Sequence, residues 1–151
     1  MNRPSIPPLE QIQAIAGHQF PGGNYRIEHW ENFLLTDCTG AEILPGGMVH
    51  PVALFHVPII GCGTSITEMF ALGQAESDLS IIPASYDWEI FEPLIEDISY
   101  SISGRIISAE RNSDDDGNLY DRIQFCFEIH NPEKMLAVRS TITWHYTRNT
   151  L

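Results

Sequence analysis

Basic residues are scarce in this sequence. Lysine and arginine together number 8, against 20 aspartate and glutamate residues, so the formal net charge is −12. Nucleic acids and anionic membrane surfaces are held mainly by lysine and arginine side chains. No basic patch or basic–aromatic motif is present, so we expect no nucleic-acid partner. A ligand that carries phosphates would depend on a few well-placed arginines or on a partner chain.

Cysteine is also scarce, and metal-binding spacings are missing. Cys38, Cys62 and Cys126 are odd in number and widely separated, with no CxxC pair. The histidines form no HxH or HxxxH pattern, so we predict reduced thiols and no metal site. The acidic run Asp114–Gly117 matches a calcium loop only in part, because Ile123 stands where the bidentate glutamate belongs. A solvated hairpin turn is the favoured interpretation of this run.

Long hydrophobic runs are absent as well. No segment approaches the roughly 20 apolar residues that a membrane span requires, and the N-terminus has no apolar core of a signal peptide. We therefore expect a soluble, cytoplasmic protein that contacts no membrane. Three prolines fall within residues 1–8 and predict a flexible N-terminal segment. At 151 residues, the remaining 9–151 fit a single domain.

The sequence does contain long segments in which apolar and polar residues alternate. Such a period of two is typical of half-buried strands. It predicts an antiparallel meander of three strands, with turn-forming residues between them, and an extended segment before the meander. In order along the chain, these segments are 80–91, 98–106, 122–129 and 136–146.

The middle of the chain has helical character instead. After Gly46 and Gly47, residues 49–57 are apolar almost all round, which is typical of a buried helix. Pro51 suits its first turn, and Pro58 is expected to help end it. Shorter helices are predicted at 8–16 and 29–35. The segment TSITEMFALG has helical spacing and a Ser65–Glu68 capping box, although the sequence leaves open whether a helix resumes there.

A central buried helix followed by a sheet of long antiparallel strands predicts an α+β hotdog fold. The wrapping of the sheet around the helix explains why that helix is apolar on every side. A cystatin-like cone, which also ends in long antiparallel strands, is the alternative. That fold opens with longer amphipathic helices than this N-terminus offers.

The order of these features resembles the MaoC-like dehydratase and hydratase family of hotdog proteins. The resemblance covers roughly residues 10 to 147. It rests on short segments in a characteristic order, namely Gly17 with Tyr25-Arg26-Ile27, Leu35–Gly40, Gly47-Met48-Val49-His50-Pro51, and the proline-ended strand Tyr86–Leu94.

The resemblance implies a ligand and a reaction. Family members act on acyl thioesters of coenzyme A or acyl carrier protein, hydrating or dehydrating enoyl and 3-hydroxyacyl groups without any further cofactor. Catalytic members carry an aspartate after a Thr/Ser-Gly pair and a histidine five residues further on, which together handle water and a proton. Here Thr39-Gly40 is followed by Ala41, and the second position is Gly46. Neither side chain can transfer a proton.

Three interpretations of the missing dyad remain open. Asp37 and His50 could form a relocated acid/base pair at the start of the central helix, where backbone N–H groups favour a developing oxyanion. His50 is alternatively a capping histidine bonded to the backbone, and Asp37 a solvated or capping carboxylate. The chain could instead be a non-catalytic hotdog subunit, or a thioesterase. We expect it to form a homodimer or a hetero-oligomer with another hotdog subunit.

Overall fold

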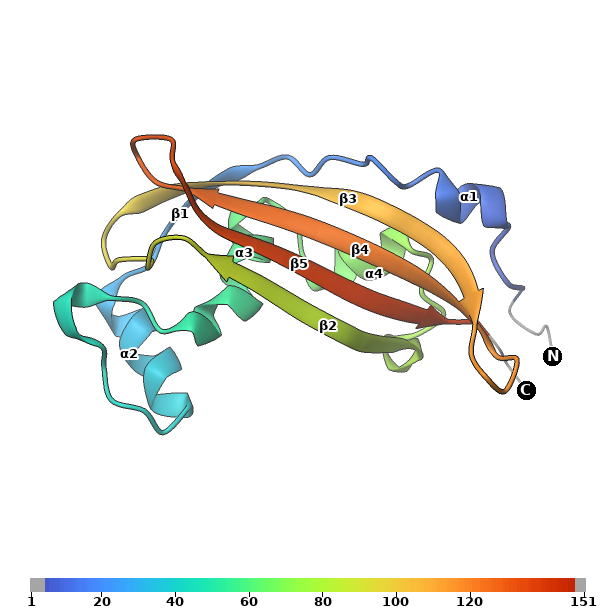
Figure 1. Ribbon diagram of the computed structural model, residues 1–151, viewed down its shortest axis with the longest axis horizontal. Coiled ribbons are helices and arrows are strands. Elements are labelled where there is room, and N and C mark those ends of the chain that lie inside the picture. Colours follow the sequence, from blue (N-terminus) through green and yellow to red (C-terminus); the bar gives the residue numbers. More distant parts are fainter. Residues whose placement is uncertain (1–4, 149–151) are drawn as a thin grey trace.

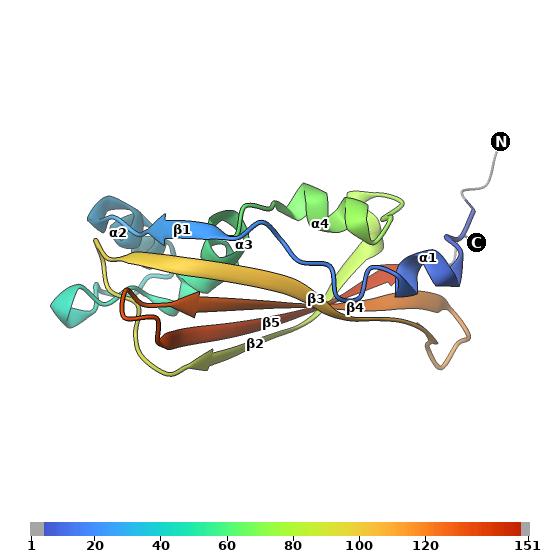
Figure 2. The same ribbon diagram turned by 90° about the horizontal axis from the view of Figure 1, so that it is seen from above.

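The computed structural model of this chain describes residues 5–148. Its strands are β1 (Gly23–Arg26), β2 (Ile81–Ile90), β3 (Ser99–Ser113), β4 (Leu119–His130) and β5 (Leu136–Thr147). They form one antiparallel sheet in the order β1-β3-β4-β5-β2, so β1 and β2 are its edges. The long strands curve around a group of short helices on one face of the sheet (Figure 1, Figure 2).

The predicted meander is confirmed, because the alternating side chains of β3, β4 and β5 divide between two faces. Ile123, Phe125 and Phe127 on β4 are completely buried against the helices. Their neighbours Arg122 and Gln124 point to the other face and are only partly covered. The strand predicted at 80–91 is β2. The edge strand β1 was not predicted, since four residues are too few to show a period of two.

The helical segments differ in length from those that the sequence suggested. They are α1 (Leu9–Gln13), α2 (His29–Cys38), α3 (Val57–Gly61), α4 (Ile66–Leu72) and the 3-10 turns η1 (Pro45–Gly47), η2 (Pro51–Phe55) and η3 (Asp78–Ser80). Figures 1 and 2 place α3 and α4 on the face that the sheet encloses, α1 at one end and α2 at the other. The helix predicted at 8–16 is thus shortened to α1, and the one at 29–35 extends to Cys38.

The prediction of one continuous buried helix over 49–57 is wrong. A 3-10 turn ends at Phe55, His56 has non-helical backbone angles, and α3 begins at Val57. Pro58 therefore lies in the first turn of α3, where its missing N–H has no partner to lose, instead of ending the preceding helix. Phe55 is 48% exposed. The segment 49–57 is therefore apolar on every side without being buried on every side.

The helix that the sequence left open does form, as α4. The Ser65 side chain caps it by accepting a hydrogen bond from the Glu68 backbone N–H at 3.1 Å. The Glu68 carboxylate does not complete a capping box. It accepts a hydrogen bond from the Thr64 hydroxyl at 2.9 Å instead.

Two glycines allow α3 to lie directly on the sheet. A Cβ on Gly104 of β3 would meet the Phe127 ring at 2.5 Å and the Cys62 sulfur at 3.0 Å. A Cβ on Gly61 at the end of α3 would collide with Ile102 of β3. Side chains at either position would push the helix off the sheet.

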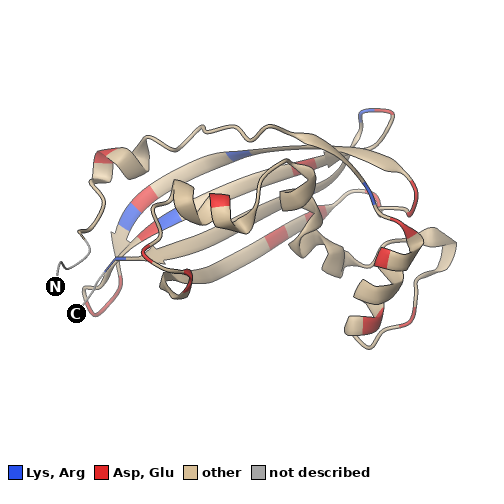
Figure 3. Cartoon of the chain, turned by 180° about the vertical axis from the view of Figure 1, so that it is seen from behind, with Lys and Arg blue, Asp and Glu red and all other residues tan. Residues whose placement is uncertain are grey.

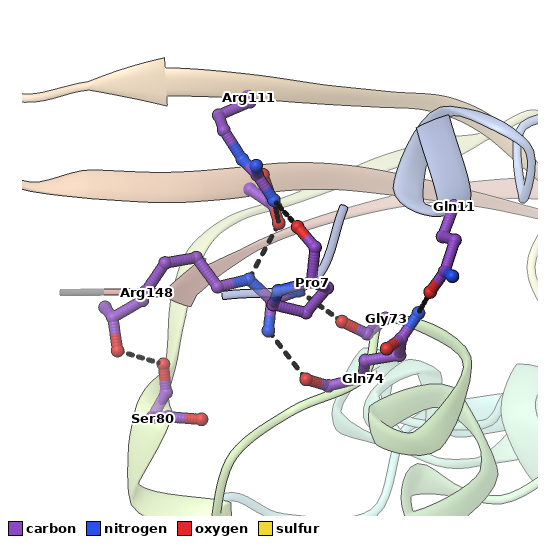
Figure 4. A network of polar contacts seen from close by, with 9 residues as sticks. Pro7, Gln11, Gly73, Gln74, Ser80, Arg111 and Arg148 are labelled. Carbon is purple, nitrogen blue, oxygen red and sulfur yellow. Dashed lines mark hydrogen bonds and ion pairs between the residues drawn. The ribbon is translucent and has the colours of Figure 1, made fainter. Parts of the chain in front are cut away.

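A buried ion cluster joins the strands to the end of α4 (Figure 4). The Asp121 carboxylate is fully buried and accepts hydrogen bonds from Arg111 Nε at 2.8 Å and Arg148 Nε at 2.7 Å. The guanidinium of Arg148 also donates to the carbonyl oxygens of Gly73 and Gln74. These carbonyls follow α4 and would otherwise lack a partner.

The same cluster contacts the N-terminal segment that was predicted to be flexible. Residues 1–4 of that segment lie outside the described residues. Within the described part, the Pro7 carbonyl accepts a hydrogen bond from Arg111 Nη2 at 2.7 Å, which links this segment to β3 (Figure 4).

The loop between β3 and β4 is the predicted hairpin turn. Asp114 Oδ1 accepts hydrogen bonds from the backbone N–H groups of Asp116 and Asn118.

Cys62 and Cys126 are buried free thiols, and Cys38 is an exposed one. Over residues 5–148, no group of three potential metal ligands comes together. In the same range, no helix has the length and hydrophobicity needed to cross a membrane.

Candidate functional site

The start of the central helical segment is held in place by a buried asparagine of α2. Asn32 is completely buried, and its amide nitrogen donates to the Met48 carbonyl at 3.1 Å and to Glu96 Oε1 at 2.7 Å. Its oxygen accepts from the His50 backbone N–H at 3.1 Å and from the Thr36 hydroxyl at 3.3 Å. One side chain therefore ties α2, the turn before η2 and the loop before β3 together.

The Glu96 carboxylate belongs to the same cluster. Its side chain is 12% exposed. The hydrogen bond from Asn32 holds the pKa of Glu96 below its ordinary value, and His29 Nδ1, 3.0 Å away, adds to this effect. Glu96 is thus a fixed negative charge with assigned partners, which makes it a positioning group rather than a proton donor.

His50 caps η2 with its ring. Nδ1 accepts a hydrogen bond from the Val52 backbone N–H at 3.0 Å, so the predicted capping role is present. A nitrogen that accepts carries no proton, so the neutral ring carries its proton on Nε2. The cap therefore orients His50 and leaves it with one hydrogen-bond donor at Nε2.

The side chain of His50 lines an apolar cavity of about 100 Å³. The cavity lies between the start of η2, the loop before it, the end of β2 with the loop that follows, and β5. It is lined by Leu44, Met48, Val49, His50, Pro51, Leu54, Ile90, Pro93, Leu94 and Val138. His50 is the one titratable side chain among these lining residues, so the cavity suits an apolar group with a single polar contact at one wall.

Asp37, the other predicted site residue, does not line this cavity. It lies in the last turn of α2 and is exposed, whereas Asn32 and Thr36, four residues apart on one helix face, are buried. In the described part of the chain, no hydrogen bond or ion pair connects the Asp37 carboxylate to His50. Ala41 and Gly46 lie on the exposed loop between α2 and η2. The structure thus shows no contact between Asp37 and His50, and the acid/base pair stays a prediction.

A second polar cluster was missed at the sequence level. Glu31 Oε1 accepts a hydrogen bond from the Tyr25 hydroxyl at 2.7 Å and lies 3.2 Å from His56 Nε2. None of the three residues lines the cavity at His50. Since they come from β1, α2 and the η2–α3 junction, they fasten three elements together. Nothing in the local sequence pattern indicates that these residues meet.

This cluster predicts an unusual tyrosine titration. Burial, followed by the hydrogen bond and the charge of Glu31, raises the pKa of Tyr25 to about 12. The raised folded-state pKa of Tyr25 contributes to folding stability. This contribution is fully present below the ordinary tyrosine pKa of about 10 and is lost as the pH rises towards about 12. Ultraviolet titration of the wild type against Tyr25→Phe isolates this phenolate. Glu31→Gln should lower the midpoint, and a wild-type midpoint near 10 would contradict the assignment.

Several hollows in the surface are larger than this cavity, and two of them are shallow and open. One, of about 570 Å³, lies between the segment 18–21 and α4. The other, of about 440 Å³, lies near the β3–β4 hairpin and includes His145, whose pKa is lowered by burial and by Arg122. Neither is lined by His50 or Asp37, and neither is enclosed, so the smaller cavity at His50 is the better candidate site.

The charges around this site are mainly negative. Figure 3 shows acidic residues on α2, which carries Glu31 and Asp37. Most basic side chains are already in ion pairs: Arg26, Arg105, Arg111, Arg139 and Arg148. Among residues 5–148, this leaves Arg122 and Lys134 as basic side chains without an ion pair. The chain therefore offers few cations for phosphate groups.

Comparison with known proteins gives structural likeness only. No family model and no curated protein matches the chain. The ChsH1–ChsH2 complex from Mycobacterium tuberculosis is 9% identical, with a TM-score of 0.66 over 94% of this chain and 91% of that chain. The monoamine oxidase regulatory protein from Archaeoglobus fulgidus is 11% identical, with a TM-score of 0.63 over 94% of this chain and 95% of that chain.

A third similar structure is the HadBC (3R-hydroxyacyl-ACP dehydratase) complex from Mycobacterium tuberculosis. It is 11% identical, with a TM-score of 0.60 over 87% of this chain and 96% of that chain. The chain therefore has the hotdog fold that its sequence resemblance to MaoC-like proteins implied, and the cystatin-like alternative is set aside. At these identities, the likeness establishes the fold and leaves the activity to the site.

Proposed function

We propose that this chain is an acyl-thioester-binding subunit of a MaoC-like hotdog assembly, and that it supplies an acyl pocket without a catalytic dyad of its own. The observation that carries the proposal is the apolar cavity at the start of η2, in which His50 is the one titratable lining residue. An apolar cavity with one hydrogen-bond donor can bind and orient an acyl group. It has no second group to move a proton at the α-carbon.

In this proposal His50 positions the thioester. Its Nε2–H donates to the thioester carbonyl, while Nδ1 stays bonded to the Val52 N–H. Leu54, Ile90 and Val138 contact the acyl chain. The thioester brings its own carrier, coenzyme A or acyl carrier protein, and no other cofactor is needed.

The catalytic groups and the carrier contacts would come from a partner hotdog subunit. Edge strand β2 has no second neighbour within the sheet and exposes Ile82 and Ile90, with Phe91 directly after it. An unpaired edge with exposed apolar side chains is suited to strand pairing with another chain. Two of the similar structures are themselves complexes, which supports an assembly of this kind. We further propose that this assembly works in the cytoplasm.

Binding of hexanoyl-CoA, measured by calorimetry on the chain with its co-purified or added partner, tests the proposal. We expect His50→Asn to weaken binding about 5- to 10-fold, because one hydrogen bond contributes about 1 kcal/mol. Asparagine keeps a side-chain oxygen that can cap η2. His18→Ala, in the 570 Å³ hollow, is the matched control and should leave the affinity unchanged. A loss of affinity in His18→Ala, with none in His50→Asn, would place the binding site in that hollow instead.

A hydratase with His50 as its acid/base group is the second candidate, favoured by the oriented Nε2–H. Two measurements with crotonyl-CoA and a longer enoyl-CoA separate the activities. Loss of absorbance reports hydration, and release of free thiol reports hydrolysis of the thioester. We expect neither signal from the chain alone. A hydration rate that His50→Asn abolishes would replace the subunit proposal with a hydratase, and thiol release would indicate a thioesterase.

A further inference from the structure

Two polar side-chain atoms are buried side by side on the inner face of the sheet without a hydrogen-bond partner in the described range. They belong to Trp88 on β2 and Ser140 on β5, which are opposite each other in the antiparallel register. Neither the indole Nε1 nor the hydroxyl Oγ forms a hydrogen bond with any residue in the described range. Ser140 is completely buried.

The position of this pair relates it to the cavity at His50. Ile90 and Val138 line that cavity and are also opposite each other on β2 and β5. Two residues further along each strand, on the same face, come Trp88 and Ser140, roughly 7 Å beyond. Leu54 of η2 lines the cavity, and the next residue, Phe55, packs edge-on against the Trp88 indole with ring centroids 4.8 Å apart. The pair therefore lies next to the residues that line the cavity, on the same face of the sheet.

A neighbouring tryptophan shows what is unusual about Trp88. Trp144 is buried on the inner face, and its Nε1 donates to the Tyr86 hydroxyl at 3.1 Å. A buried polar group without a partner is costly, and nearly all such groups in native proteins are satisfied. Apolar side chains at 88 and 140 would avoid that cost. A donor and a hydroxyl at adjacent buried positions indicate a polar group that comes from outside the chain.

We infer that Trp88 and Ser140 recognise an oxygen atom at the far end of the acyl chain, so that the ligand is an oxygenated acyl thioester rather than a plain hydrocarbon one. This inference rests on the proposed function, because the cavity must first hold an acyl chain. The indole N–H donates to a hydroxyl, oxo or amide oxygen, and the Ser140 hydroxyl donates or accepts. The site selects such a ligand because a plain chain leaves both groups unpaired.

The strand register gives the position of this oxygen. The Trp88–Ser140 pair lies roughly 7 Å beyond Ile90 and Val138, which line the cavity. With the thioester at His50, the oxygen belongs near the end of a six-carbon chain. It does not belong next to the thioester.

The test is calorimetric binding of four probes that differ only in one hydroxyl: hexanoyl-CoA and its 3-, 5- and 6-hydroxy forms. The wild-type protein, studied with its partner as above, should bind the 5- or 6-hydroxy form at least 10-fold more tightly than hexanoyl-CoA. In Ser140→Ala and Trp88→Phe this ratio should fall close to 1. Ser103→Ala, at an exposed position of β3, is the matched control and should keep the wild-type ratio.

A second measurement separates recognition from a purely structural role. If the pair serves an external oxygen, Ser140→Ala in the free protein should leave the melting temperature unchanged or raise it. A clear fall would show that the hydroxyl stabilises the fold through a bound water, and would overturn the inference. Equal affinity for all four probes would also overturn it and leave the proposed function intact. Failure of every probe to bind would remove the proposed function and the inference together.

Discussion

Replacement of Asp121 by asparagine is expected to lower the free energy of unfolding by about 3 kcal/mol or more. The Asp121 carboxylate is fully buried between Arg111 and Arg148, and the Arg148 side chain is only 2% exposed. Removing one partner of a buried ion pair leaves an uncompensated charge, which typically costs about 3–5 kcal/mol. Urea unfolding followed by circular dichroism measures the loss.

The matched control for this substitution is Asp116→Asn in the exposed β3–β4 hairpin, which should change stability by less than about 0.5 kcal/mol. The Asp121→Asn effect should also change little with salt, since buried pairs are poorly screened. A loss below about 1 kcal/mol, or one that disappears at high salt, would mean that this cluster is exposed to water in solution.

Replacement of Asn32 by alanine should produce the second large effect, also about 3 kcal/mol. The completely buried Asn32 amide bonds the Met48 carbonyl, the Glu96 carboxylate and the His50 backbone N–H. Its removal leaves these groups unpaired, at about 1–3 kcal/mol for each one that water cannot reach. Because His50 loses its backbone anchor, acyl-thioester affinity should fall as well. Chemical unfolding and calorimetry measure the two effects.

The pKa of Glu96 provides an independent readout for this substitution. It is held below its ordinary value first by Asn32, so it should rise in Asn32→Ala. A depressed carboxylate pKa contributes stability that is present above the unfolded-state pKa and lost as the pH falls through the folded-state pKa. The variant should therefore lose less stability on acidification than the wild type. Asn24→Ala, at an exposed position of β1, is the control. An unchanged Glu96 titration in Asn32→Ala would contradict the assigned contact.

The candidate site was only partly accessible from the sequence. His50 could be singled out because the pattern GMVHP marks the start of a helical segment, and the structure places His50 at that position, facing a cavity. Asp37, the predicted partner of His50, is exposed in the last turn of α2. The role of Asn32 had no local signal, since an asparagine inside a helix usually indicates nothing about its contacts.

The sequence by itself determined the three long strands, the turns between them and the caps at Ser65 and His50. These features depend on alternation and on residues a few positions apart, which a local pattern records. Only the tertiary structure decided that the central helix breaks at His56, that Asp121 meets Arg148, and that Trp88 lies opposite Ser140. These features depend on strand register and on burial, and the two pairings join residues that are far apart in the chain. No local pattern contains that information.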